Sequence, residues 1–104
     1  YDNVNESMNL EPLHEKIKAF NFHTIEIDGN NMEQIVEALK EAYETKDKTT
    51  AIICNTIKGK GVSFMENNPK WHSGGISDEE YEIAKKDLEK IEEELTKWIM
   101  KWYV

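Results

Sequence analysis

The chain has 104 residues and a formal net charge of -8, from 21 acidic and 13 basic side chains. This length allows one domain with a modest core, which buries roughly 60–70% of the surface of the unfolded chain. The negative charge argues against a nucleic-acid backbone or an anionic membrane as the main partner, because both would repel the protein. Any anionic ligand must therefore meet a local basic patch.

Cysteine content and hydropathy indicate a cytoplasmic protein. Cys54 is the single cysteine, so no disulfide can form within the chain, and its apolar neighbours lead us to expect a buried thiol. No apolar run approaches the roughly 20 residues of a membrane span, and no leader-like segment opens the sequence. Because the chain begins at Tyr1 in the loop-like stretch YDNVNES, we expect it to be part of something longer.

The predicted elements alternate between helix and strand. Residues 1–9 are expected to form a loop. Apolar residues then recur at spacings of three and four from Leu10 to Phe20, which predicts an amphipathic helix over residues 10–20. The stretch HTIEIDG, residues 23–29, alternates between apolar and polar side chains, as does a half-buried strand that runs into a turn.

A second helix and a second strand follow. Asn31 can cap a helix that ends near Lys46, and Gln34 can reach back to that cap. The run TTAIICNTI, residues 49–57, is apolar and rich in β-branched residues, which predicts a strand covered on both faces. The apolar face predicted for the second helix comprises Ile35, Leu39, Ala42 and Tyr43.

This order of elements predicts an α/β fold with a partial parallel sheet of about two strands and crossover helices. Two parallel strands are too few for a sheet buried on both faces, so further strands must come from a partner chain or from a larger domain. We divide the chain into a loop over residues 1–9, an α/β core over residues 10–76 and a long helix over residues 77–104.

The long helix shows the clearest periodicity. Ser77 and Glu80 form a capping-box pattern, after which apolar residues alternate steps of three and four. Such a seam packs on its own domain, on another copy of the chain or on a partner subunit. The seam consists of Tyr81, Ala84, Leu88, Ile91, Leu95, Trp98 and Trp102.

The candidate site is the stretch TIKGKGVSFMENNPKWHSGG, residues 56–75, which leaves the second strand at its carboxyl end, where open parallel sheets bind ligands. Gly59 and Gly61 would let backbone N–H groups approach an anion, and Lys58 and Lys60 supply positive charge. His72 can donate to a phosphate oxygen or move a proton near neutral pH. On spacing alone, a flexible turn with a surface histidine is the simpler interpretation, since neither a Walker loop nor a dinucleotide fingerprint is present.

Three stretches closely resemble the last part of the thiamine diphosphate-binding region of transketolase, particularly the separate N-terminal subunit of the split bacterial and archaeal enzymes. They are MNLEPLHEKIKAFNFHTIEIDGNN, AIICNTIKGKGVSFMENNPKWHSGG and SDEEYEIAKKDL, between residues 8 and 88. The resemblance implies a cytoplasmic enzyme that moves a two-carbon ketol unit between sugar phosphates. It also implies thiamine diphosphate and a divalent cation, usually magnesium, as cofactors, with active sites at a dimer interface.

The same resemblance implies roles for individual residues. His72 matches the family histidine that lies beside the cofactor's diphosphate and assists catalysis. Gly59 and Gly61, with Lys58 and Lys60 beside them, match the loop that lines this pocket.

The chain also departs from the family. The family's metal-binding motif, its substrate histidines and its second domain have no match here, and Asn3 is not assigned to the metal. The tail from Trp98 to Val104 has no family counterpart.

We therefore expect a C-terminal fragment of a transketolase of the pentose phosphate pathway, one that contributes part of the diphosphate pocket and is inactive alone. Its expected partners are a C-terminal transketolase subunit or domain and further copies of itself. Two alternatives stay open. One is an interaction module that self-associates through the seam and binds no cofactor; the other is a fragment of a related enzyme such as deoxyxylulose phosphate synthase.

Overall fold

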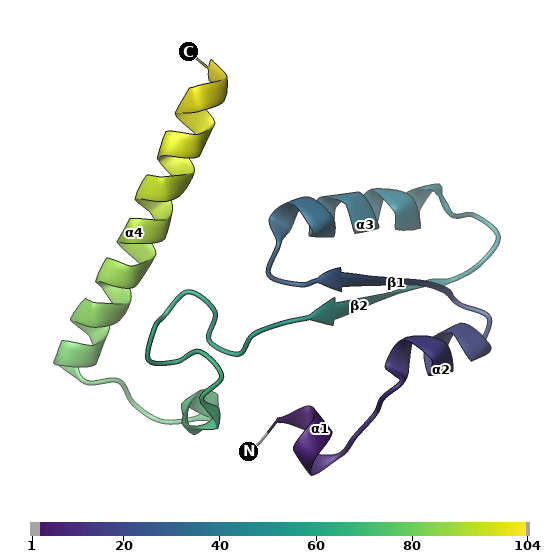
Figure 1. Ribbon diagram of the computed structural model, residues 1–104, viewed down its shortest axis with the longest axis horizontal. Helices are drawn as coiled ribbons and strands as arrows, with labels where there is room; N and C mark the ends of the chain where they lie inside the picture. The colour runs from purple at the N-terminus through teal and green to yellow at the C-terminus, as the bar shows by residue number, and fades with distance from the viewer. Residues whose placement is uncertain (1–2, 104) are drawn as a thin grey trace. The chain divides into compact units, whose positions relative to one another are not determined.

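The structure, a computed structural model, describes residues 3–103 and divides the chain into two units, Tyr1–Ile57 and Lys58–Val104. Figure 1 shows the elements of each. None of the helices within the described residues is long and apolar enough to cross a membrane. The first unit holds α1 (Val4–Ser7), α2 (Leu13–Ala19), β1 (His23–Asp28), α3 (Met32–Glu44) and β2 (Thr50–Asn55), and the second holds the 3-10 helix η1 (Pro69–His72) and α4 (Asp78–Tyr103).

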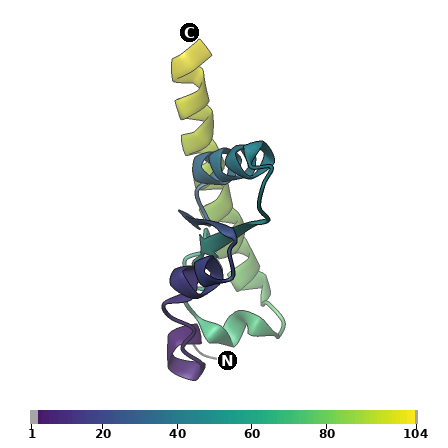
Figure 2. The same ribbon diagram turned by 90° about the vertical axis from the view of Figure 1, so that its right-hand side faces the viewer.

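The sheet of the first unit consists of β1 and β2, which pair in parallel. The register sets His23 beside Thr50 and Asp28 beside Asn55, and α3 makes the crossover between the strands. Figure 1 and Figure 2 show α3 on one face of this sheet and α2 on the other. The predicted α/β fold, with a two-stranded parallel sheet and a long C-terminal helix, is therefore confirmed.

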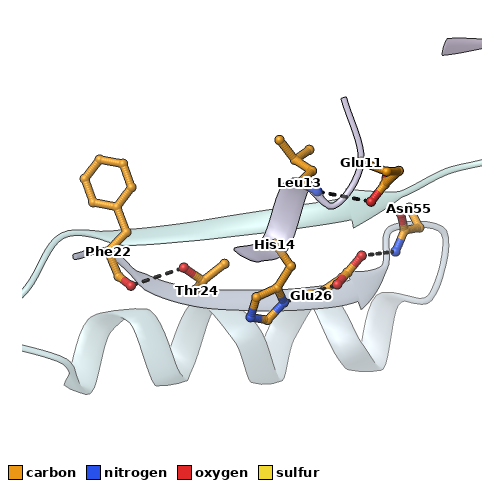
Figure 3. A network of polar contacts seen from close by, with 7 residues as sticks. All are labelled: Glu11, Leu13, His14, Phe22, Thr24, Glu26 and Asn55. Atoms are coloured by element: carbon orange, nitrogen blue, oxygen red, sulfur yellow. Dashed lines mark hydrogen bonds and ion pairs between the residues drawn. The ribbon is translucent and has the colours of Figure 1, made fainter. Parts of the chain in front are cut away.

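Side-chain alternation along β1 decides which residue meets which helix. His23 faces α3, where its Nε2 lies 2.7 Å from Glu41 Oε1. Glu26 faces α2, and its Oε2 lies 3.2 Å from His14 Nδ1 while its Oε1 accepts a hydrogen bond from Asn55 Nδ2 at 3.1 Å (Figure 3). The Asn55 amide, and after it His14, lower the pKa of Glu26. One polar contact on each face thus ties a helix to the sheet.

The helix ends follow local backbone chemistry. Pro12 is the N-cap of α2, and the helix ends at Ala19, two residues before Asn21, whose φ is +67°. Asn31 caps α3 as predicted, because its side chain accepts from the Gln34 N–H at 3.1 Å. The Gln34 side chain accepts from the Asp28 N–H at 2.8 Å instead of returning to the cap, so it ties α3 to the end of β1.

The N-terminal segment differs from the prediction in two places. Residues 4–7, within the expected loop, form the single helical turn α1, capped by the Asn3 side chain, which accepts from the Asn5 N–H at 3.0 Å. The helix predicted over residues 10–20 is shorter at both ends, and Leu10 and Phe20 are exposed. The helix begins only after Pro12, because proline has no N–H and holds the preceding residue in extended conformations.

The face that α3 buries matches the predicted one only in part: Ile35 and Ala42 are half-buried as predicted. Ala38 is 2% exposed, whereas Leu39 and Tyr43 are 58% and 77% exposed. The prediction was wrong for Leu39 and Tyr43 because α3 carries two apolar stripes, and the stripe with the small Ala38 lies against the sheet. The exposed stripe comprises Met32, Val36, Leu39 and Tyr43.

The second strand is also less covered than predicted. It spans residues 50–55 instead of 49–57, and both α2 and α3 pack mainly on β1. Burial along β2 ends at Ile53, so Cys54 is exposed and the predicted buried thiol is wrong. Just beyond β1, a Cβ atom on Gly29 would lie 2.6 Å from Cys54 Cβ and 2.7 Å from Thr56 Cγ2. The close approach of the two segments therefore requires glycine at position 29.

Gly29→Ala tests this requirement. We expect the substitution to lower the free energy of unfolding by about 1–3 kcal/mol, because the added methyl group would overlap the end of β2. Urea denaturation followed by circular dichroism measures the change. Gly75→Ala is the matched control, since a Cβ atom at Gly75 meets nothing within 4 Å. Equal midpoints for the two variants would contradict the packing described at Gly29.

Candidate functional site

The stretch predicted to bind an anion, Lys58 to Gly61, forms a closed loop in the second unit. The Asn67 N–H donates to the Lys58 carbonyl oxygen at 2.9 Å. Gly59 and Gly61 both adopt positive φ, +71° and +103°. A Cβ atom on Gly59 would lie 2.6 Å from the Met65 carbonyl oxygen, so only glycine fits this position. The two glycines therefore have the backbone freedom for which the sequence singled them out.

The loop already holds a carboxylate. The Gly61 N–H donates to Glu66 Oε1 at 3.1 Å, and Lys60 Nζ lies 4.0 Å from the same oxygen. A backbone donor and an ammonium group thus converge on one anionic oxygen, the geometry by which glycine loops bind anions. Glu66 was not among the predicted site residues. An acidic residue close after two lysines and two glycines was the available signal, but in so acidic a chain it did not stand out.

A second carboxylate joins the loop to α4. Asp87 Oδ2 accepts from the Ser63 N–H at 2.8 Å and from the Ser63 hydroxyl at 2.7 Å. The hydroxyl, and after it the N–H, lower the pKa of Asp87 because both stabilise the ionised carboxylate. Beside this clamp, a Cβ atom on Gly61 would lie 3.5 Å from methyl groups of both Leu88 and Ile91. The polar clamp and the apolar contact together fix the loop against the helix.

An open depression of about 480 Å³ lies between the loop and α4. Two lysines, Lys60 and Lys90, and two carboxylates border it, and the carboxylates are already engaged by donors of the loop. The lysines are therefore the groups that an anionic ligand would meet. The lining residues are Lys60, Gly61, Ser63, Glu66, Asp87, Lys90 and Ile91.

His72 lies at the end of η1, in the turn that follows the loop. The Asn68 side chain caps η1 by accepting from the Lys70 N–H at 3.1 Å. The rings of Phe64 and Trp71 pack at 5.2 Å between centroids and are tilted by 57°. Trp71 is half-buried and His72 is exposed. An aromatic pair thus supports the turn that carries His72, while the role of the imidazole itself stays a prediction.

The residues of this unit fit a small anion better than a metal ion. Positive-φ glycines, lysines and a convergent N–H are the chemistry of phosphate binding. In the stretch from residue 3 to residue 103, no three His, Cys, Asp or Glu side chains gather as a metal cage requires. We therefore assign no metal ligand to the described residues.

Comparison with known proteins gives the family. Residues 2–95 match the family described as transketolase, thiamine diphosphate binding domain. The chain belongs to this family. The resemblance inferred from the KGKG…WH stretch is thereby confirmed.

Three relatives are longer than this chain and match it over part of their length. The 6-deoxy-6-sulfo-D-fructose transketolase subunit of Clostridium sp. (strain MSTE9) is 42% identical over 81 residues, which cover 78% of this chain and 30% of that protein. An apulose-4-phosphate transketolase subunit of Phocaeicola vulgatus is 38% identical over 93 residues, 86% of this chain and 33% of that protein. Transketolase 1 of Pasteurella multocida is 38% identical over 74 residues, 70% of this chain and 11% of that protein. The chain thus spans about a third of the first two relatives.

The Ser63–Asp87 clamp can be tested by titration. Ser63→Ala removes the hydroxyl donor and keeps the N–H, so we expect the pKa of Asp87 to rise toward the ordinary 3.8 without reaching it. A lowered pKa contributes stability that is present above the unfolded pKa and is lost as the pH falls through the folded pKa. The variant should therefore lose less stability than the unchanged chain between about pH 5 and pH 2.

Carbon-13 NMR of the Asp87 carboxyl group measures its pKa, and denaturation at several pH values measures the stability. Ser73→Ala is the control, since Ser73 lies in the same segment beyond η1. An Asp87 pKa that is identical in Ser63→Ala and in the unchanged chain would refute the clamp.

Proposed function

We propose that this chain is part of a transketolase, which transfers a two-carbon ketol unit between sugar phosphates. In this proposal it contributes one wall of the pocket for the cofactor's diphosphate and is inactive alone. The observation that carries the proposal is the loop at Gly61, where an N–H and the Lys60 ammonium group converge on one anionic oxygen. Membership of the thiamine diphosphate-binding family supports a diphosphate as the natural occupant.

The loop residues would hold the diphosphate by releasing the Glu66 carboxylate and binding a phosphate oxygen in its place. A phosphate oxygen would take the place of Glu66 Oε1, accept from the Gly61 N–H and pair with Lys60. Lys58, at the start of the same loop, would add a second positive charge. Charge-assisted hydrogen bonds of this kind are stronger than neutral ones, so the exchange favours a ligand with more than one negative charge.

His72 would complete the wall from the other end of the segment. Its exposed imidazole follows the half-buried Trp71, whose ring packs on Phe64 and limits how far the turn can move. In this position the imidazole can donate to a phosphate oxygen or pass a proton near neutral pH. Gly74 and Gly75, shortly after it, leave room for a ligand to approach, since a Cβ atom at either would meet nothing within 4 Å.

The reaction itself belongs to the assembled enzyme. Thiamine diphosphate, when bound, supplies the nucleophilic carbon that attacks the ketose donor. The inactivity proposed for the isolated chain is supported by its coverage, 30% and 33% of two relatives named as subunits. A partner transketolase subunit or domain, magnesium as the counter-ion of the diphosphate and a cytoplasmic location belong to the same proposal. The three relatives described above are all named transketolases, which favours this reaction over that of deoxyxylulose phosphate synthase.

Titration calorimetry with thiamine diphosphate and magnesium tests the pocket. We expect the unchanged chain to bind and His72→Ala to bind about tenfold to a hundredfold more weakly, the value of one hydrogen bond to a charged group. His14→Ala is the control, because this histidine contacts Glu26 in the first unit. No measurable binding by the unchanged chain, or equal affinity for the His72 variant, would contradict the proposed wall.

Glu66→Gln tests whether the loop is where the anion binds. The amide oxygen can still accept from the Gly61 N–H, so the loop keeps its shape while the competing negative charge is lost. We expect inorganic pyrophosphate to bind a few-fold to about tenfold more tightly, measured by calorimetry at low ionic strength. Glu82→Gln removes the same charge from an exposed position of α4 and serves as the control. Unchanged or weaker binding by the Glu66 variant would exclude the loop as the anion site.

A further inference from the structure

The last two turns of α4 carry an exposed apolar surface. Toward the start of the helix, Ala84 is buried, and Leu88 and Ile91 approach the loop at Gly61. Beyond Ile91 the seam continues to Trp102 with every large side chain exposed. We call these residues the α4 terminal patch: Leu95, Trp98, Ile99 and Trp102.

The patch is ordered on the helix and lies largely outside the family pattern. The rings of Trp98 and Trp102, one helical turn apart, stand 6.1 Å from each other. The match to the thiamine diphosphate-binding family ends at residue 95, whereas α4 continues to Tyr103. Two adjacent tryptophans on an exposed helix face are typical of a protein–protein contact. Three of the four patch residues therefore lie beyond the residues matched to the family.

The charges along α4 indicate what kind of surface fits the patch. Residues 89–94 carry four glutamates and one lysine, and residues 96–103 carry two lysines and no acidic residue. Glu94 and Lys101 are seven residues apart, so they lie on the same side of the helix, next to the seam. A helix with an acidic stretch followed by a basic stretch is complementary in charge to a second copy of itself that runs in the opposite direction.

We propose that the α4 terminal patch binds the same patch of a second copy of the chain, with the two helices antiparallel. An alignment centred between Thr96 and Lys97 sets Leu95 against Trp98 of the second copy and Ile91 against Trp102. Beside the contact between Leu95 and Trp98, Glu94 of one helix lies near Lys101 of the second copy. Because the pair of helices has two-fold symmetry, this ion pair forms twice. The acidic stretch of each helix then faces the basic stretch of the other.

The parallel alternative fits less well. In a parallel pair of helices, the flanking contacts join the residue just before every second seam position to the residue five positions further along the other chain. That arrangement joins Glu80 with Lys85, but it also sets Asp87 against Glu92 and leaves Glu94 opposite Ile99, so the glutamate beside the α4 terminal patch has no basic partner. Charge complementarity thus selects the antiparallel pairing.

Sedimentation equilibrium of the 104-residue chain tests the association. We expect a mass of two chains at micromolar concentration and at least a hundredfold weaker association for Trp98→Glu. Met100→Glu is the matched control: Met100 is 57% exposed and Trp98 59% exposed, but a separation of two residues places them on opposite faces of the helix. A monomeric unchanged chain, or equal loss of association in both variants, would overturn the proposal.

Charge reversal tests the orientation with variants that keep the apolar patch intact. Glu94→Lys and Lys101→Glu should each weaken association about tenfold, and the double variant should recover most of it. If the double variant associates no better than the two single variants, the antiparallel pairing is wrong. Circular dichroism of each variant checks that α4 stays helical. Trp98→Glu should bind thiamine diphosphate as the unchanged chain does, so failure of this inference is distinct from failure of the proposed diphosphate wall.

Discussion

The turn from β1 into α3 is the constraint on which the first unit depends. Here the Gly29 N–H donates to the Asn55 carbonyl oxygen at 2.8 Å, and the Asn30 side chain accepts from the Ile57 N–H at the same distance. The turn therefore fixes where both strands end and the point from which the chain continues toward Lys58. Because Gly29 packs directly against Cys54, the pairing of the strands tolerates no larger residue there.

Sequence patterns predicted the kinds of element well and their faces less well. The caps at Asn31 and at the Ser77–Glu80 pair depend only on local spacing, and both form as expected. At the start of α4, the Ser77 N–H donates to the Glu80 carboxylate at 2.9 Å, and the Glu80 N–H donates to the Ser77 hydroxyl oxygen at 3.1 Å. The buried face of α3 could not be predicted in this way. Two apolar stripes with helical period are equivalent until the sheet selects the one that allows the closer approach, at Ala38.

In the candidate site, too, features set by local sequence were predictable and contacts between distant residues were not. The positive φ of Gly59 and Gly61 follows from local sequence, and so does the aromatic support before His72. The carboxylates that satisfy the loop could not be read from the motif. Asp87 lies 24 positions from Ser63, and its role depends on how α4 returns to the loop. In a chain with 21 acidic residues, composition does not distinguish a carboxylate that binds a loop from one that faces water.

The sheet described above has two strands, and this has a consequence for its backbone. In a paired strand, successive N–H and C=O groups point alternately to the two sides, so a strand with one neighbour satisfies only half of them through the sheet. The outer sides of β1 and β2 therefore each present a ladder of donors and acceptors. Such a ladder is matched by water or by another strand, and the uncharged TAIICN sequence of β2 presents no charged side chain that would hinder a strand from adding there. The first unit is in this sense a template that a wider sheet can extend on either side.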